Sequence, residues 1–235
     1  MLDYNNSVDI RIVSSEESGI ELAKTTLYEK CAKDTVLFLS GGETPKPLYK
    51  VLATEQRLKV GAVAMVDDRY SFHQQYSNEI MIKASGFLDF LDQQNSAFYP
   101  ILEFGFSREK TATQYEDTVS FLLNHFPKNI AIMGIGEDGH TAGIPVGVPS
   151  SEMQIKNENY VAEFNSFLKE PKERVTLTFR ALSMIDLLIV LAFGENKKAA
   201  LERVFTSKDE AETPACFYNR PEVSKKTLLI TDQKI

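Results

Sequence analysis

The sequence predicts an open α/β fold in which a mostly parallel sheet carries helices on both faces. Short β-rich runs alternate with helical patterns along the chain, and this alternation is typical of parallel sheets built from strand–helix–strand units. Several of the runs are continuously apolar, as expected for strands that are covered on both sides. We expect strands at residues 8–13, 35–40, 63–66, 129–134, 160–164, 174–179, 186–192 and 227–231.

Helical patterns fill the segments between these strands. Ser14 and Glu17 have the spacing of a capping box and predict the start of a helix. Thr44 followed by Pro45 suits a helix N-cap and first helical position. From Ala112 to Phe126, apolar residues recur at three- and four-residue steps, which indicates a helix with one buried stripe.

The length and charge of the chain exclude several classes of protein. We expect residues 1–235 to form one domain, because this length suffices for a sizeable core. Lys and Arg total 26 against 33 Asp and Glu, so the formal net charge is −7. We expect no nucleic-acid partner, because neutralising phosphates needs a surplus of cations. A phosphate-bearing ligand would need a local site, and the sequence leaves the oligomeric state open.

The sequence predicts a cytoplasmic protein with no membrane partner, no metal and no cofactor. Two cysteines are too few for a disulfide framework. The N-terminus lacks the basic and apolar regions of a signal peptide, and the most apolar stretch, 184–193, is half a membrane span. Three scattered histidines without a cysteine pair argue against a zinc site, and the glycine spacing does not fit a dinucleotide.

The turn after the expected strand 35–40 is a candidate phosphate site. In open parallel sheets, ligands lie outside the carboxyl ends of the strands. Gly41 and Gly42 allow the backbone to approach a ligand closely. Their N–H groups, the next helix N-terminus and the hydroxyls of Ser40 and Thr44 are suited to hold a phosphate. An ordinary strand-to-helix turn is the alternative interpretation.

The turn after strand 129–134 is the most informative part of the sequence. Its residues, GIGEDGHT (134–141), place three glycines around Asp138 and His140. Histidine is the most common general base, and a nearby carboxylate fixes its tautomer and raises its basicity. The alternative is a histidine that only caps the loop.

Cations near other strand ends are candidate anion ligands. Arg69 follows strand 63–66 directly and could clamp an anion or stabilise an oxyanion, with Asp67 or Asp68 orienting it. Lys197 lies in a first helical turn, where a cation opposes the helix dipole unless an anion binds there. Arg174, at a strand start, is a possible second anion ligand. The alternative for Arg69 is a surface salt bridge. For Lys197 it is a solvated lysine, and for Arg174 an ordinary edge residue.

The order of these motifs resembles that of the 6-phosphogluconolactonases and, more widely, of the group that includes glucosamine-6-phosphate deaminases. The resemblance runs from about residue 8 to residue 231. It is carried by SGGETP (40–45), DDR (67–69), Ser77-Asn78, GIGEDGHTA (134–142), RVTLT (174–178) and GENKKAAL (194–201).

The resemblance implies a fold of the sugar-phosphate isomerase type and hydrolysis of a phosphosugar lactone, 6-phosphoglucono-1,5-lactone, in the oxidative pentose phosphate pathway, without metal or cofactor. His140 would activate water, Asp138 would tune that base, and Arg69, with Arg174 as a candidate second group, would meet the oxyanion or the substrate's polar groups. The 6-phosphate would be held by Ser40, Gly41, Gly42, Thr44 and Lys197.

Two departures from the family pattern leave alternatives open. The family usually has DER at 67–69, and SLFPG where this chain has GIPVG (143–147). A glucosamine-6-phosphate deaminase would carry glutamate five residues after the histidine, where this chain has Pro145. A sugar-phosphate sensor without turnover is the second alternative, supported only by the altered loop.

Overall fold

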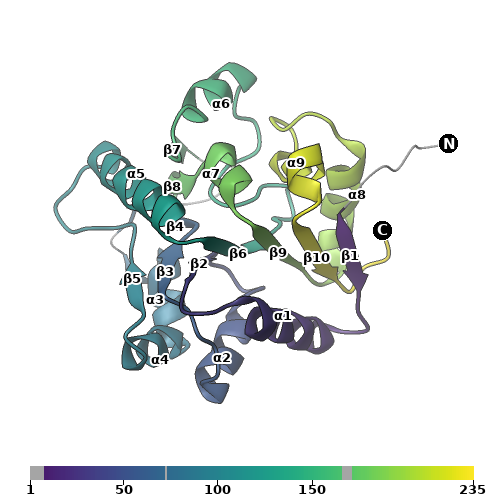
Figure 1. Ribbon diagram of the computed structural model, residues 1–235. Helices are drawn as coiled ribbons and strands as arrows, with labels where there is room; N and C mark the ends of the chain where they lie inside the picture. Colours follow the sequence, from purple (N-terminus) through teal and green to yellow (C-terminus); the bar gives the residue numbers. More distant parts are fainter. Residues whose placement is uncertain (1–7, 72, 166–170) are drawn as a thin grey trace.

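The computed structural model describes residues 8–71, 73–165 and 171–235. Its main element is a seven-stranded, all-parallel sheet with the order β1-β10-β9-β6-β2-β3-β5 (Figure 1). Every residue of β2 is buried, as expected for a strand covered on both faces. The strands are β1 (Asp9–Ile12), β2 (Thr35–Leu39), β3 (Ala62–Met65), β5 (Ala97–Tyr99), β6 (Lys128–Gly134), β9 (Leu187–Ala192) and β10 (Thr227–Thr231).

Helices lie on both sides of this sheet, which confirms the predicted α/β class (Figure 1). Below it in the view are α1 (Glu16–Lys30), α2 (Lys46–Glu55), α3 (Asn78–Ala84) and α4 (Phe87–Gln93). Above it are α5 (Arg108–His125), α6 (Ser150–Lys156), α7 (Phe179–Met184), α8 (Lys198–Thr206) and α9 (Pro221–Ser224). The short 3-10 helices are η1 (Gln74–Tyr76), η2 (Glu195–Lys197) and η3 (Pro214–Asn219). No helix in the described ranges has both the length and the apolar character needed to cross a bilayer.

A second sheet corrects part of the strand prediction. The expected strands 160–164 and 174–179 correspond to β7 (Val161–Asn165) and β8 (Glu173–Leu177), which pair antiparallel outside the parallel sheet. Residues Asp67–Arg69, expected to be a turn, form β4 and pair antiparallel with β8. The chain changes sheets at Val66. Its N–H donates to Leu39 O (2.8 Å) in the main sheet, while its carbonyl accepts from Leu177 N (2.8 Å). Strand β5 was not predicted.

Two helix starts also differ from the prediction. Ser15, not Ser14, is the N-cap of α1, and its side chain accepts from Ser18 N (3.3 Å). Pro45, not Thr44, is the N-cap of α2. The proline ring holds φ near the helical value, and the Pro45 carbonyl accepts from Tyr49 N (3.2 Å) to close the first turn. Thr44 therefore lies directly before the N-cap, two residues before the first residue of the helix.

The sheet order places a switch point between β2 and β6. From β2 the chain moves outward to β3 and β5, whereas from β6 it moves the other way, to β9 and β10. The connections after two adjacent strands therefore diverge, and open α/β sheets bind ligands in the crevice that this divergence leaves. The turns after β2 and β6 are the two that the sequence singled out.

Candidate active site

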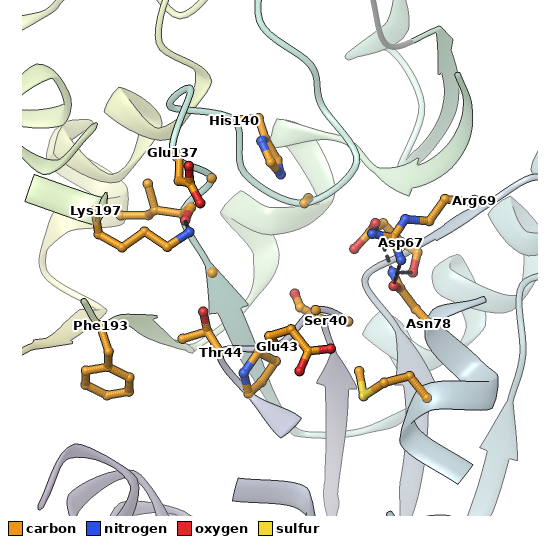
Figure 2. A pocket seen from close by; sticks show the side chains of 18 of the residues that line it. Ser40, Glu43, Thr44, Asp67, Arg69, Asn78, Glu137, His140, Phe193 and Lys197 are labelled. Atoms are coloured by element: carbon orange, nitrogen blue, oxygen red, sulfur yellow. Dashed lines mark hydrogen bonds between the residues drawn. The ribbon is translucent and has the colours of Figure 1, made fainter. Parts of the chain in front are cut away.

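A cavity of about 720 Å³ opens at the carboxyl ends of β2 and β6; we call it the main cavity (Figure 2). Seven of the nine residues that the sequence proposed for the site line this cavity. Those lining it are Ser40, Gly41, Gly42, Thr44, Arg69, His140 and Lys197. Other polar residues in the lining are Glu16, Glu43, Asp67, Gln75, Ser77, Asn78, Glu137 and Asn196.

The turn at residues 40–44 forms the floor of the main cavity (Figure 2). Ser40 is 5% exposed, and its carbonyl accepts from the Tyr49 hydroxyl at 2.7 Å. Gly42 has a φ of +97°, a conformation that residues with side chains rarely adopt. A side chain at Gly41 would collide with Asn78. This backbone is thus tied to α2 at one end and lies against the start of α3 at the other.

The turn at residues 134–141 holds the imidazole of His140 over this floor, pointing into the main cavity (Figure 2). Asp138 Oδ1 accepts from His140 N at 3.1 Å and contacts His140 Nδ1 at 2.5 Å. A carboxylate so close to Nδ1 keeps the proton on that nitrogen and leaves Nε2 as an acceptor. A Cβ on Gly136 would overlap the imidazole ring, so a glycine there is needed for this arrangement.

Later parts of the chain support the histidine turn from behind. The Gly139 carbonyl accepts from Ala215 N (2.9 Å), and Gly147 N donates to Ala211 O (2.7 Å). The Thr141 hydroxyl is 2.6 Å from the hydroxyl of Tyr218, a buried side chain in η3. The turn is therefore fixed on both sides of the imidazole.

Arg69 borders the main cavity on the side opposite Lys197 (Figure 2). Its Nη1 donates to Tyr76 O (3.1 Å) and to Asn78 Oδ1. Asp67 lies beside it, 7% exposed, and accepts from Asn78 Nδ2 at 3.2 Å. Burial raises the pKa of Asp67, while the positive charges of Arg69 and Arg174 oppose that shift. Of the two neighbouring aspartates, Asp67 is therefore the one that lines the cavity beside the arginine.

Asp68 has a different role from Asp67. Its carboxylate accepts from the Ser77 hydroxyl (3.1 Å) and from the backbone N–H groups of Asn78 (2.8 Å) and Glu79 (3.2 Å). It therefore satisfies N–H groups that the start of α3 would otherwise leave unpaired. Burial raises the pKa of this carboxyl to about 6, and the bonds from Asn78 and Glu79 limit the shift.

Lys197 and Lys198 diverge. Lys197 Nζ donates to Ile135 O at 2.9 Å and reaches into the main cavity above Thr44 (Figure 2). Lys198 is half exposed, and its Nζ lies 3.9 Å from Glu195 Oε1. Of these two lysines, only Lys197 lines the main cavity. Lys197 therefore lies on the wall of the main cavity, whereas Lys198 lies outside its lining.

Asp138 and Arg174 belong to a smaller neighbouring space of about 90 Å³, the side cavity. It shares Asp67, Arg69 and His140 with the main cavity, and Pro145 also lines it. Arg174 Nη1 donates to Glu173 O (3.1 Å) and to Pro171 O. Arg174 is thus close to the histidine and to Arg69 but does not line the same cavity as residues 40–44.

Three residues of the main cavity were missed as functional groups. Asn78 holds Arg69 and Asp67, although only its place in a family motif had marked it. Glu137 was read as part of the histidine turn without a role. Its carboxylate accepts from Asn196 Nδ2 at 2.8 Å. The sequence signal that could have marked this pair is Asn196, a polar residue directly before Lys197.

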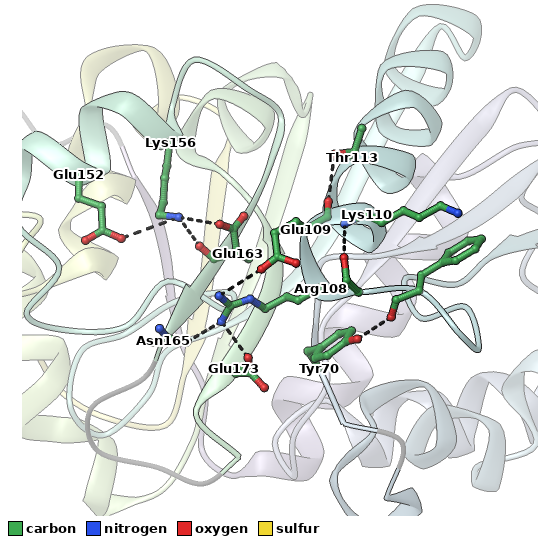
Figure 3. A network of polar contacts seen from close by, with 12 residues as sticks. Tyr70, Arg108, Glu109, Lys110, Thr113, Glu152, Lys156, Glu163, Asn165 and Glu173 are labelled. Atoms are coloured by element: carbon green, nitrogen blue, oxygen red, sulfur yellow. Dashed lines mark hydrogen bonds and ion pairs between the residues drawn. The ribbon is translucent and has the colours of Figure 1, made fainter.

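A third cavity, of about 270 Å³, lies apart from these two, between α5, α6 and β7; we call it the outer cavity (Figure 3). Its cations face carboxylates. Arg108 Nη1 is 3.2 Å from Glu173 Oε1, and Lys156 Nζ is 3.4 Å from Glu163 Oε1. Within the described part of the chain, no group of three or more His, Cys, Asp or Glu residues has the arrangement of a metal site.

A family model described as glucosamine-6-phosphate isomerases/6-phosphogluconolactonase matches residues 17–228. The chain belongs to this family. Its relatives include a 6-phosphogluconolactonase of Nostoc sp., 29% identical over 188 residues, which are 76% of this chain and 75% of the relative. A 6-phosphogluconolactonase of Xylella fastidiosa is 28% identical over 224 residues, 91% of this chain and 88% of the relative.

Solved structures show the same fold. A 6-phosphogluconolactonase from Shewanella baltica has a TM-score of 0.78 at 18% identity and covers 95% of this chain and 97% of its own. The Thermotoga maritima enzyme has a TM-score of 0.70 at 24% identity, with 95% and 98% covered. The family spans two activities, so the site residues themselves must separate them.

Proposed function

We propose that this chain hydrolyses 6-phosphoglucono-1,5-lactone to 6-phosphogluconate, as a step of the oxidative pentose phosphate pathway. The observation that carries the proposal is the orientation of His140. Its ring faces the cavity floor at residues 40–44 while Nδ1 lies 2.5 Å from the Asp138 carboxylate. Lactone hydrolysis requires a base for water, donors for an oxyanion and an anchor for the phosphate.

The proposed reaction begins with a water molecule beside His140 Nε2. As the water oxygen bonds to the lactone carbonyl carbon, its proton passes to Nε2, and the Asp138 carboxylate stabilises the resulting imidazolium. The negative charge that develops on the carbonyl oxygen faces the Arg69 guanidinium. The ring C–O bond then breaks, and the departing oxygen takes the proton back from Nε2. The immediate product is an open chain with a hydroxyl and a carboxylic acid, which then loses its proton to water and becomes the carboxylate.

The 6-phosphate is proposed to bind between the floor and Lys197. Gly41, Gly42 and Thr44 offer backbone N–H groups, and Ser40 and Thr44 offer hydroxyls, whereas the Ser40 N–H is donated to Ile132 O. Lys197 supplies the cation on that side of the main cavity. The phosphate is remote from the reacting carbon, so its binding energy serves to position the carbonyl. Arg174, in the side cavity, is proposed to act on the lactone end, not on the phosphate.

Glucosamine-6-phosphate deamination is the weaker candidate. The glutamate that would complete the deaminase relay is replaced by Pro145, which lines the side cavity together with Asp138 and His140. An apolar ring stands where a carboxylate would be needed. A coupled assay for ammonia release from glucosamine 6-phosphate separates the two activities.

The decisive test is hydrolysis of freshly generated lactone, corrected for spontaneous opening, with wild-type protein and His140→Asn. Loss of one general base typically lowers the rate by about 10²–10⁴-fold. We expect a loss in this range, with binding of 6-phosphogluconate retained. His125→Asn is the matched control, since His125 lies in the last turn of α5, away from the cavities described above. An unchanged rate in His140→Asn would refute the assignment of the base. Phosphosugar binding without any acceleration would indicate a sensor.

A further inference from the structure

Asn78 is the only described residue whose side chain is hydrogen-bonded to both Asp67 and Arg69. It is the first residue of α3 and is 2% exposed. Its Nδ2 donates to Asp67 O (3.0 Å) and Asp67 Oδ2 (3.2 Å), and its Oδ1 accepts from Arg69 Nη1. An amide donates from one atom and accepts at another, which lets a short side chain hold a carboxylate and a guanidinium at once.

The same side chain contacts the floor of the main cavity. A Cβ on Gly41 would collide with the Oδ1, Cγ and Cβ atoms of Asn78, so backbone and amide are in close contact. The Asn78 backbone is fixed as well, because its N–H donates to Asp68 Oδ1 at 2.8 Å. Asn78 thus spans the space between the floor and the arginine.

We propose that Asn78 is a positioning residue that sets the direction of the Arg69 guanidinium relative to the phosphate-binding floor. Its acceptor oxygen holds Nη1, and its donor nitrogen keeps the neighbouring Asp67 carboxylate turned toward α3. The remaining N–H groups of Arg69 are thereby left to meet a ligand in the main cavity. The catalytic part of this inference rests on the proposed lactonase function, whereas the orientation of Arg69 does not.

The substitution Asn78→Asp tests the amide with almost no change in shape. The carboxylate still accepts from Arg69 and is favourable at a helix N-terminus, so we expect the variant to fold. However, it loses the donor and faces the Asp67 carboxylate, and two carboxylates sharing one site cannot both ionise easily. The titratable or charged groups around this position are Asp67, Asp68, Arg69, Glu79, Tyr49, His140 and Arg174.

We expect Asn78→Asp to lower kcat about 10–100-fold, because misplacing a group that acts in the transition state lowers kcat. KM should rise less than kcat falls, because the groups that hold the phosphate are unchanged although the added charge lies beside Gly41. The ratio of variant to wild-type kcat should rise as the pH falls from about 8 to about 5, since a proton on either carboxyl restores a donor between them. Taking the ratio removes the pH effects that are common to both proteins.

Asn219→Asp is the matched control. It also removes an amide donor, from Asn219 Nδ2 to Val204 O (2.5 Å), but at a distance from the cavity. We expect its kcat ratio to be independent of pH. An Asn78→Asp variant with unchanged kcat, with a raised KM alone, or with a pH-independent ratio would overturn the proposal.

A measurement without turnover separates this proposal from the lactonase assignment. In protein labelled with ¹⁵N-arginine, the Arg69 side-chain signals are identified by their loss in Arg69→Lys. A guanidinium held by Asn78 and Tyr76 rotates slowly and gives distinct Nη–H resonances, which we expect to merge in Asn78→Ala. Unchanged Arg69 signals in Asn78→Ala would refute the positioning role. Wild-type protein that fails to hydrolyse the lactone would refute the proposed function alone.

Discussion

The main cavity and the outer cavity both contain two cations, but they use them differently. In the outer cavity, Arg108 and Lys156 face Glu173 and Glu163 directly (Figure 3). In the main cavity, Arg69 donates to the neutral oxygens of Tyr76 and Asn78, and the described bond of Lys197 goes to the carbonyl of Ile135.

Neutral acceptors fix the direction of a cation without cancelling its charge, whereas a carboxylate neutralises it. Arg69 therefore keeps its direction, and its charge can meet an incoming anion, although the Asp67 carboxylate lies beside it. The outer cavity consists of ion pairs near the surface, and such pairs typically contribute little to stability. The comparison indicates that the ability of a cavity to bind an anion depends less on how many cations it has than on whether carboxylates already pair with them.

The largest expected effect on activity is that of replacing Asp138, the carboxylate that contacts His140. In Asp138→Asn, an amide can donate to His140 Nδ1, which moves the ring proton to Nε2 and removes the acceptor for water. By analogy with catalytic triads in which the orienting carboxylate becomes an amide, we expect lactone hydrolysis to fall by about 10³–10⁴-fold. Circular dichroism should be unchanged. A loss below about tenfold would show that Asp138 is not needed to set the tautomer.

The second prediction uses a substitution that preserves charge. Arg69→Lys keeps the cation but loses the planar group that can bond Asn78 and a ligand together. We expect kcat to fall by about 10²–10³-fold, the range for loss of one oxyanion donor. Steady-state kinetics on fresh lactone measures it. If Arg69→Lys retained full activity, a directed guanidinium would not be required.

The third prediction concerns stability and the raised pKa of Asp68, which lies next to the site. A carboxyl whose pKa is about 6 when folded and about 3.9 when unfolded binds its proton more tightly in the folded state. Its contribution to stability is therefore fully present below about pH 4 and is lost as the pH rises through about 6.

Relative to Asp68→Asn, the wild-type free energy of unfolding should thus decrease between about pH 4 and pH 6, by about 2–3 kcal/mol in total. Urea unfolding at a series of pH values measures this difference, which cancels the titration of the other groups. A difference independent of pH would show that the hydrogen bonds from Asn78 and Glu79 hold the pKa of Asp68 near its ordinary value.

The smallest effect is expected in the outer cavity. Arg108→Lys repeats the Arg69→Lys change where the cation faces carboxylates. It also removes a buried Nε that has no hydrogen-bond partner among the residues that the structure describes. We expect activity within about twofold of wild type and a stability change below about 1 kcal/mol. A large loss of activity here would undo the distinction between the two cavities.

Local signals in the sequence were sufficient to find the parts of the fold that form the floor and the histidine turn. Apolar runs predicted β2 and β6, and the glycines after them marked turns that can approach a ligand. Both turns lie at the switch point of the sheet, which is where open α/β sheets bind their ligands. The placement of His140 beside Asp138 follows from a spacing of two residues within one turn.

Features that depend on distant partners could not be predicted. Strand β4 has three residues and exists because Asp67 pairs with Thr176, which lies more than a hundred positions further along the chain. Arg174 was expected beside the other anion ligands, but β8 carries it into the side cavity. Asn78 gave no chemical signal of its own, since its role depends on Asp67, Arg69 and Gly41 meeting around one amide.

The bonds behind the histidine turn have a consequence for chimeric proteins. Gly139, Thr141 and Gly147 are held by residues between 211 and 218, so the imidazole is placed by two segments about seventy residues apart. Transplanting residues 134–147 alone into a relative would transfer the reactive groups without the residues between 211 and 218 that hold them in place. Recombination between family members should therefore keep both segments from the same parent, and crossovers between them should yield folded but poorly active hybrids.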